Sequence, residues 1–139
     1  MRKNIVYVTR KLHFNAAHRL HNPSLTDLEN QKLYGPCNNK NGHGHNYEIE
    51  VTVYGSPDPK TGYLIDLKEL KNLIETRIVN ECDHKHLNLD VPWLEGINPT
   101  AENLAIAFWD RIEHEIKNGK LYAIRLFETE RNIVEYRGE

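Results

Sequence analysis

The ten residues from His45 to Tyr54 alternate between apolar and polar side chains, and this pattern constrains the fold more than any other feature of the sequence. The apolar positions are Tyr47, Ile49, Val51 and Val53, and the polar positions are Glu48, Glu50 and Thr52. Because successive side chains of a β-strand point to opposite faces, the segment is predicted to be a strand with one covered and one open face. The chain therefore needs other elements to cover that sheet.

The remaining periodic segments supply those elements. Alternation predicts further strands at 5–14, 121–129 and 133–137. Helical spacing of apolar residues predicts one helix at 67–78, capped by Asp66, and a second from the NPTAEN stretch through Ile116, stopped by Asn118-Gly119. A loop at 22–41 holds a short helix candidate at 26–33. Consecutive strand pairs separated by helices predict an α+β fold, with a four-stranded antiparallel sheet and two helices packed on one face.

Length and composition narrow the class of protein. At 139 residues, the chain is predicted to be a single domain, 1–139. A net charge of −2 gives no basic stripe, so we expect no nucleic-acid partner. No apolar run is long enough to span a membrane and no signal peptide is evident, so we expect a cytoplasmic protein without a membrane partner. In that setting Cys37 and Cys82 are predicted to be free thiols.

A His-Gly-His stretch suggests a metal site. His43 and His45 are two residues apart on an extended segment, so both imidazoles leave the same face. They are either a pair of exposed strand histidines or two ligands of one cation. His18 could supply a third ligand. Four other histidines compete for that position, and spacing alone does not choose His18 over them: His13, His21, His84 and His86. Three neutral imidazoles with one open position would form a catalytic zinc site.

Cys37 stands six residues before His43, in polar surroundings that argue against a core position. It could be a fourth ligand, which would close the metal site, or a base or nucleophile beside an open metal. The adjacent pair Asp83-His84 favours the second reading, because a carboxylate and an imidazole together can orient and move a proton.

Glu128 continues the apolar register of its predicted strand, where a carboxylate is costly unless a donor meets it. It is either a solvated strand end or an acceptor for a ligand edge with two adjacent N–H groups, such as a guanine-like or pterin ring. Thr100 and Glu102 begin the second predicted helix. A helix cap and a charge that complements the helix dipole explain both residues equally well.

Taken together, these stretches closely resemble the 6-pyruvoyl-tetrahydropterin synthase family over nearly the whole chain. The matching segments are HRLHNPSL, CNNKNGHGHNY, DPKTG, DHKHLNLDVPWL, NPTAENLA and LFETERNIVEYRGE. The resemblance implies a tunnelling fold (T-fold), in which subunits form trimeric barrels that stack as a homohexamer with active sites at subunit interfaces. It also implies zinc held by His18, His43 and His45, catalysis by Cys37, Asp83 and His84, and substrate binding by Thr100, Glu102 and Glu128. One departure is His86, where the family pattern has Asn, and Cys82 is interpreted as structural.

The implied reaction converts 7,8-dihydroneopterin triphosphate to 6-pyruvoyl-tetrahydropterin with release of triphosphate. Candidate cations for the triphosphate are Arg19, Lys40 and Lys85. One alternative is 6-carboxy-tetrahydropterin synthase of deazaguanine biosynthesis, which shares the fold and substrate but usually has a shorter gap between the cysteine and His-Gly-His; here five residues intervene. The other is a non-catalytic metal- or pterin-binding module, which would be expected to lose Cys37 or the Asp83-His84 pair.

Overall fold

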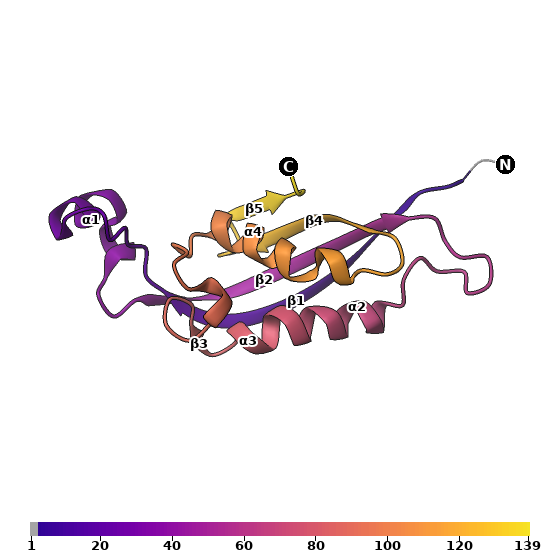
Figure 1. Ribbon diagram of the computed structural model, residues 1–139, viewed down its shortest axis with the longest axis horizontal. Coiled ribbons are helices and arrows are strands. Elements are labelled where there is room, and N and C mark those ends of the chain that lie inside the picture. Colours follow the sequence, from indigo (N-terminus) through magenta and orange to yellow (C-terminus); the bar gives the residue numbers. More distant parts are fainter. Residues whose placement is uncertain (1–2) are drawn as a thin grey trace.

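The computed structural model describes residues 3–139, which form one long twisted sheet with helices along it (Figure 1). In chain order the elements are β1 (Val6–His18), α1 (Asp27–Tyr34), the 3₁₀ turn η1 (Gly35–Asn38), β2 (His43–Gly55), α2 (Leu67–Ile74), the π-helical turn η2 (Glu75–Val79), α3 (Asn80–Cys82), β3 (Lys85–His86), the 3₁₀ turn η3 (Pro92–Leu94), α4 (Ala101–Ile112), the 3₁₀ turn η4 (Glu113–Glu115), β4 (Lys120–Phe127) and β5 (Ile133–Tyr136).

The sheet has five strands in the order β3-β1-β2-β4-β5, so the prediction of four antiparallel strands was wrong. The added strand, β3, lies parallel to the end of β1, and the other neighbouring strands pair antiparallel. The backbone bonds from His84 N to Asn15 O (2.6 Å) and from Leu87 N to Ala17 O (2.7 Å) flank it. A strand of two residues is too short to show an alternating pattern, which is why the sequence did not reveal it.

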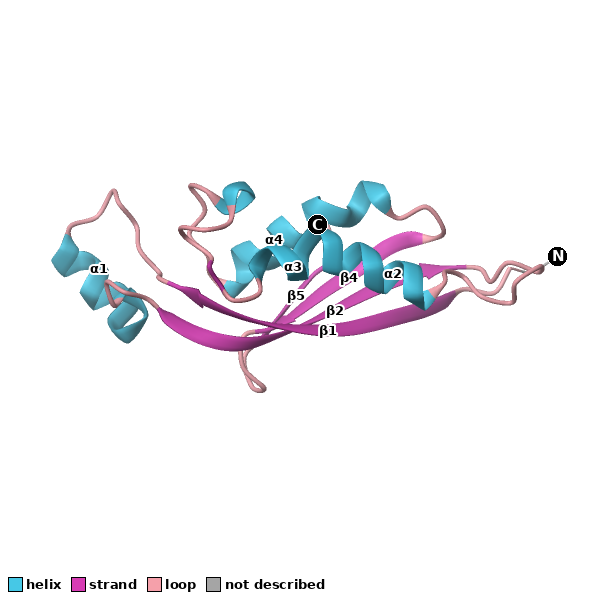
Figure 2. Cartoon of the chain, turned by 90° about the horizontal axis from the view of Figure 1, so that it is seen from below, coloured by secondary structure: helices cyan, strands magenta, loops and turns pink. Residues whose placement is uncertain are grey.

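Helices cover one face of this sheet (Figure 2). The helical turns α2, η2 and α3 follow one another directly from Leu67 to Cys82, and α4 lies beside them, while α1 stands apart at one end of the molecule. The predicted apolar face of β2 is fully buried beneath them. Phe14 of β1 stacks on Tyr47 of β2 and meets Phe108 of α4 edge-on. The covered face predicted from the alternation in β2 is therefore the core.

The helix starts follow the predicted caps. The Asp66 carboxylate accepts from Lys68 N at the start of α2, and the Thr100 hydroxyl accepts from Asn103 N at the start of α4. The end of α4 was predicted too far along the chain, because the helix stops at Ile112 and a 3₁₀ turn follows. Ile116 still packs against the core from outside the helix, so its apolar spacing imitated one more helical turn.

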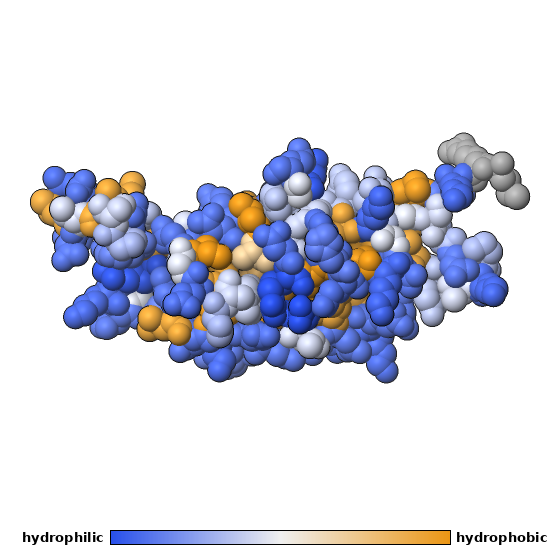
Figure 3. All heavy atoms as spheres, viewed as in Figure 1, coloured by the Kyte–Doolittle hydropathy of each residue, from blue (hydrophilic) through white to orange (hydrophobic). Residues whose placement is uncertain are grey.

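The second face of the sheet carries charged and aromatic side chains. Lys11 pairs with Glu48 across β1 and β2 (2.9 Å), and Arg125 of β4 donates to Glu50 (3.1 Å). The projecting helix α1, by contrast, exposes apolar side chains, Leu28 and Leu33, which Figure 3 shows at one end of the molecule. Among the described residues, no helix has the length and apolar character needed to cross a membrane.

Candidate metal centre and active site

The paired ends of β1 and β2 bring three histidines together. His18 is paired with His43 in the antiparallel register, and His45 follows two residues later on the same face. The three ring centres are 4.7–5.0 Å apart. One nitrogen from each ring lies within 4.8 Å of the others, so these three residues could hold a metal ion. Among the five histidines that competed for the third position, the structure therefore selects His18.

The hydrogen bonding of His18 leaves the nitrogen that faces the other rings free to bind. Its Nδ1 lies 2.8 Å from the carbonyl oxygen of Pro99, so Nδ1 carries the proton and donates it to that oxygen. Its Nε2 then presents a lone pair, 3.2 Å from Nε2 of His43. Two nitrogens on one tetrahedral Zn²⁺ lie about 3.3 Å apart, so this spacing fits a zinc ion between them.

Burial favours the neutral form of His18 and His45, and metal ligands must be neutral. His18 is 1% exposed, and burial lowers its pKa to about 4, with the neighbouring imidazoles acting in the same direction. Burial also lowers the pKa of His45. In addition, His43 Nδ1 and His45 Nε2 are buried with no hydrogen-bond partner among the described residues. A cation would satisfy the unpartnered nitrogen of His45, and the three residues fit a metal ion on these grounds.

Glu128 lies beside this cluster. Its carboxylate oxygens are 4.0 Å from His18 Nε2 and 3.9 Å from His45 Nε2. β4 ends one residue earlier, at Phe127, and the backbone bond from Glu128 N to Asn132 O (3.0 Å) holds the following turn. The carboxylate is therefore directed toward the histidines from a fixed turn, because the observed strand ends before Glu128 whereas the predicted strand, 121–129, included it.

Glu128 also connects two hollows in the surface. One is a cleft of about 970 Å³, lined by Glu128, His45, Asp83 and His84 among others. The other, of about 490 Å³, is lined by Glu128, Thr100 and Glu102 among others. The structure thus brings all three predicted substrate-binding residues to one cavity, and Glu128 joins that cavity to the histidine cluster. Thr100 is at the same time the helix cap that the simpler explanation predicted.

The Asp83-His84 pair is held against the edge of β1. Asp83 accepts from the backbone N of Asn15 (2.8 Å), which lowers the pKa of its carboxyl group, and its other oxygen lies 2.9 Å from His84 Nδ1. His84 has a left-handed backbone with φ 62°, and its imidazole is largely exposed. The carboxylate therefore orients an imidazole whose Nε2 faces solvent.

Cys37 lies apart from these groups within one chain. It sits in η1, where its carbonyl oxygen accepts from Leu20 N (2.9 Å), and its thiol is half-buried and free. It is not one of the residues that meet at the metal centre, and it does not line the cleft that holds Asp83 and His84. The other free thiol, Cys82, is fully buried in the core, where burial raises its pKa to about 12.

Two groups at the site were not identified from the sequence. One is the Pro99 carbonyl that fixes the His18 ring, and the other is the Tyr47 hydroxyl, 3.3 Å from His18 Nδ1. A backbone carbonyl has no residue-type signature, and Tyr47 was read only as a core residue. The NPTAEN stretch around Pro99 was the one available hint, and it was interpreted as a helix start.

Comparison with known proteins gives a consistent result. A family model described as 6-pyruvoyl tetrahydropterin synthase matches residues 7–139. The 6-pyruvoyl tetrahydrobiopterin synthase of Homo sapiens is 46% identical over 132 residues, which are 95% of this chain and 91% of that protein. The protein of the same name from Poecilia reticulata is 48% identical over 137 residues, 99% of this chain and 93% of its own length.

The solved structures agree with the sequence relatives. The structure of Caenorhabditis elegans 6-pyruvoyl tetrahydropterin synthase matches with a TM-score of 0.94 and 38% identity, covering 100% of this chain and 99% of that one. A Plasmodium vivax structure of the same enzyme name shares the fold at 15% identity, with a TM-score of 0.68. By the family model, the sequence relatives and the fold together, the chain belongs to the 6-pyruvoyl tetrahydropterin synthase family.

Proposed function

We propose that this chain is a zinc-dependent lyase that converts 7,8-dihydroneopterin triphosphate to 6-pyruvoyl-tetrahydropterin and triphosphate. The observation that carries the proposal is the cluster of His18, His43 and His45 with Glu128 beside it, in a chain of this family. Relatives of 45–48% identity bear the name of this enzyme. We further propose that the protein works in the cytoplasm.

The three histidines would hold the zinc ion. A set of neutral imidazoles without a fourth protein ligand is typical of catalytic zinc sites, which leave one position for substrate. Bound there, zinc would supply Lewis-acid stabilisation of negative charge on the substrate side chain. The chain contributes the rest of the chemistry through Glu128, Cys37 and the Asp83-His84 pair.

Glu128 is the proposed anchor for the pterin ring. A carboxylate accepts two parallel hydrogen bonds from adjacent N–H groups, and the ring edge of a pterin offers such a pair. The cavity that Glu128 shares with Thr100 and Glu102 provides room for the ring beside the histidines. Anchoring the ring there would direct the substrate side chain toward the proposed metal centre. The reacting atoms would then already be positioned for reaction, which lowers the entropic cost of reaching the transition state.

Cys37 and His84 are the proposed proton carriers. Loss of triphosphate breaks a carbon–oxygen bond, and the rearrangement to the pyruvoyl group moves hydrogens along the side chain without an external oxidant. Cys37, as thiolate, would take a proton from a side-chain carbon, and the imidazole of His84 would return one on the other side. Asp83 lies 2.9 Å from Nδ1 of that imidazole and fixes its orientation.

The separation of these groups within one chain supports an oligomer with shared sites. Cys37 does not line the cleft that contains Asp83 and His84, although the reaction needs all three near one substrate. We propose a homohexamer, a dimer of trimers, in which a neighbouring subunit supplies the missing partner. The sheet has room for such neighbours, because residues 6–14 of β1 pair with β2 on one side only and β5 forms the opposite edge.

The product distinguishes this proposal from its rivals. Purified zinc-loaded protein is incubated with 7,8-dihydroneopterin triphosphate, and the products are identified by mass spectrometry. We expect 6-pyruvoyl-tetrahydropterin and triphosphate in equal amounts. Formation of 6-carboxy-tetrahydropterin would assign the chain to the related deazaguanine enzyme instead. Bound zinc and pterin without turnover would make it a binding module.

A further inference from the structure

A third cavity, of about 660 Å³, lies on the segments that lead into the histidine cluster. Its charged or ionisable lining residues are Arg19, His21, Lys40 and His86, and no carboxylate of the described residues lines it. Arg19 directly follows His18, and Lys40 stands three residues before His43. Two permanent cations without a compensating carboxylate create a positive potential that favours an anion.

Arg19 is fixed in place but not neutralised. Asn88 holds its backbone on both sides, accepting from Arg19 N and donating to Arg19 O at 2.8 Å each. The guanidinium Nε donates to the Asn38 carbonyl oxygen (3.1 Å), which aligns the group. Within residues 3–139, no carboxylate forms an ion pair with it. The remaining N–H groups of this half-buried guanidinium are available to a ligand, and their fork geometry matches phosphate.

The two histidines of this cavity each present an N–H donor. The Asn38 side-chain nitrogen donates both to Leu20 O (2.8 Å) and to His21 Nδ1 (3.0 Å), so His21 carries its proton on Nε2. The backbone N of Asn88 donates to His86 Nδ1 (3.3 Å), which places the His86 proton on Nε2 as well. The structure therefore arranges two imidazole N–H groups and two cations around one cavity.

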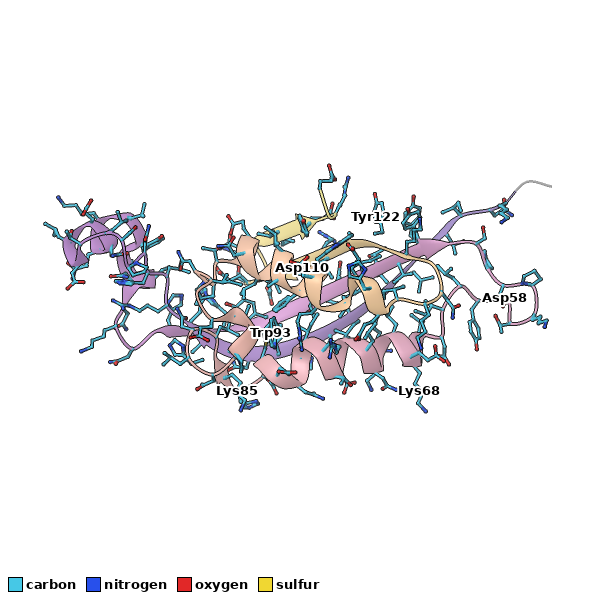
Figure 4. All side chains as sticks on the ribbon, in the orientation of Figure 1. Asp58, Lys68, Lys85, Trp93, Asp110 and Tyr122 are labelled. Carbon is cyan, nitrogen blue, oxygen red and sulfur yellow. The ribbon has the colours of Figure 1, made fainter. Side chains whose placement is uncertain are left out.

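His86 also contacts the loop that leads into the metal centre. Its Nε2 lies 2.8 Å from the position that a Cβ atom on Gly42 would occupy, directly before His43. By contrast, Lys85, the third cation considered from the sequence, is exposed at the margin of the molecule and does not line the cavity (Figure 4). Of the three cations considered from the sequence, Arg19 and Lys40 therefore line the cavity and Lys85 does not.

We propose that this cavity is a polyphosphate subsite, in which Arg19, Lys40 and the Nε2–H groups of His21 and His86 bind the triphosphate of the substrate. The inference rests on the proposed function for the identity of the ligand, whereas the anion site itself rests on the cavity. Arg19 and Lys40 are close in sequence to the proposed metal-binding histidines His18 and His43. A triphosphate bound in this cavity would therefore place the substrate carbon that carries it near the proposed zinc centre. It would also give His86, which has no role in the proposed catalytic steps, the role of a phosphate ligand.

Calorimetric binding of inorganic triphosphate to the zinc-loaded protein tests this subsite without turnover. Arg19→Gln should weaken binding about tenfold to a hundredfold, as expected for loss of hydrogen bonds to a charged group. Lys40→Gln, at an exposed position, should weaken it about twofold to fivefold. Lys85→Gln and the matched control Lys68→Gln, on the outer side of α2 (Figure 4), should bind triphosphate like the parent. Zinc content is measured after each titration, because triphosphate also binds metal ions.

Two further measurements identify the source of the phosphate and the role of the histidines. Dihydroneopterin, which lacks phosphate, should bind the Arg19→Gln/Lys40→Gln double variant as well as it binds the parent, while dihydroneopterin triphosphate should bind it more weakly. In ¹⁵N NMR spectra, both histidine rings should be in the Nε2–H form, with that proton shifting when inorganic triphosphate is added.

The outcomes separate this inference from the proposed function. Triphosphate binding that depends on Arg19 and Lys40 in a protein without lyase activity would keep the subsite and reject the proposed reaction. Equal triphosphate affinity in the parent, both single variants and the Lys68→Gln control would overturn the subsite even if the enzyme is active. A proton on Nδ1 of His21 or His86 would remove that ring from it.

Discussion

At the scale of single residues, His18 links the candidate metal centre to the stability of the protein. Burial lowers its pKa to about 4, below the ordinary value of about 6.5. As the pH falls below about 6.5, the unfolded chain takes up a proton on His18 that the folded chain does not. The free energy of unfolding of the metal-free protein should therefore fall by about 3 kcal/mol between pH 6.5 and pH 4.

Chemical denaturation of chelator-treated protein across this pH range measures the effect. His18→Gln should show a shallower decline with falling pH, with the remainder due partly to His45, whose pKa is also lowered. His114→Gln, at an exposed position, should retain the slope of the parent. An identical slope in the parent and His18→Gln would contradict this assignment.

Glu128 provides a second prediction at this scale. Glu128→Gln replaces one acceptor oxygen by a donor that faces the N–H edge of the pterin, so buried groups are left mispaired. We expect dihydroneopterin to bind about 2–3 kcal/mol more weakly. Fluorescence titration measures the dissociation constant, with Glu95→Gln as the control at an exposed position. Unchanged affinity would return Glu128 to the interpretation as a solvated strand end.

The sequence predicted part of this site on physical grounds. Strand geometry alone placed His43 and His45 on one face, and the structure confirms it. The choice of His18 needed the pairing register of β1 and β2, which depends on contacts between segments far apart in the chain. The Pro99 carbonyl contact and the tautomer of His86 depend on backbone hydrogen bonds, and the tautomer of His21 depends on the Asn38 side chain folded against it, none of which residue types alone reveal.

At the scale of elements, the long strands and helix starts were predictable and the short pieces were not. β2 was identified because ten residues alternate without interruption, and α2 because Asp66 caps an apolar repeat. β3 has two residues, and the π-helical turn η2 continues the spacing of α2, so neither has a pattern of its own. Their positions follow from packing against β1 and the core.

Gly42, just before β2, provides a test at this scale. It has φ +81°, and a Cβ atom there would lie 3.0 Å from His18 O as well as close to His86. Gly62 has φ +80° with no neighbour within 4 Å, so it serves as a matched control. Gly62→Ala should cost about 1–2 kcal/mol of stability from backbone strain alone.

Gly42→Ala should cost more than Gly62→Ala, because the His18 backbone must also shift. It should weaken metal binding too, since that shift displaces a ligand. Chemical denaturation and competition with a metal chelator measure the two effects. Equal losses of stability with unchanged metal affinity would show that the close approach at Gly42 does not hold the site together.

At the scale of the whole molecule, the position of Cys37 makes a prediction about assembly. Oligomers made only of Cys37→Ala subunits, or only of Asp83→Asn subunits, should be nearly inactive. If a site combines Cys37 of one subunit with Asp83 and His84 of another, oligomers assembled from an equal mixture contain some sites with both groups intact. Random assembly in a symmetric oligomer predicts about a quarter of the parent activity.

Co-expression of the two variants with different tags isolates the mixed oligomers for the assay. Cys82→Ala is unsuitable as a control because Cys82 is buried in the core, so mixed oligomers of the parent with itself provide the reference rate. No recovered activity in verified mixed oligomers would place the complete site within one chain. The prediction of one domain over residues 1–139 is untouched by either result and stays a prediction.

If the three histidines form the metal site of a lyase, as proposed, the reaction must depend on zinc bound there. The most direct measurement is the rate of triphosphate release from 7,8-dihydroneopterin triphosphate as a function of zinc content in one preparation. We expect release to stop when a chelator removes the metal and to return in proportion to added zinc, reaching its maximum at about one ion per chain. His43→Ala should remain folded yet neither retain zinc nor recover activity. Parent-like release by protein whose metal content has been shown to be negligible would mean that the three histidines are not the metal site of the reaction.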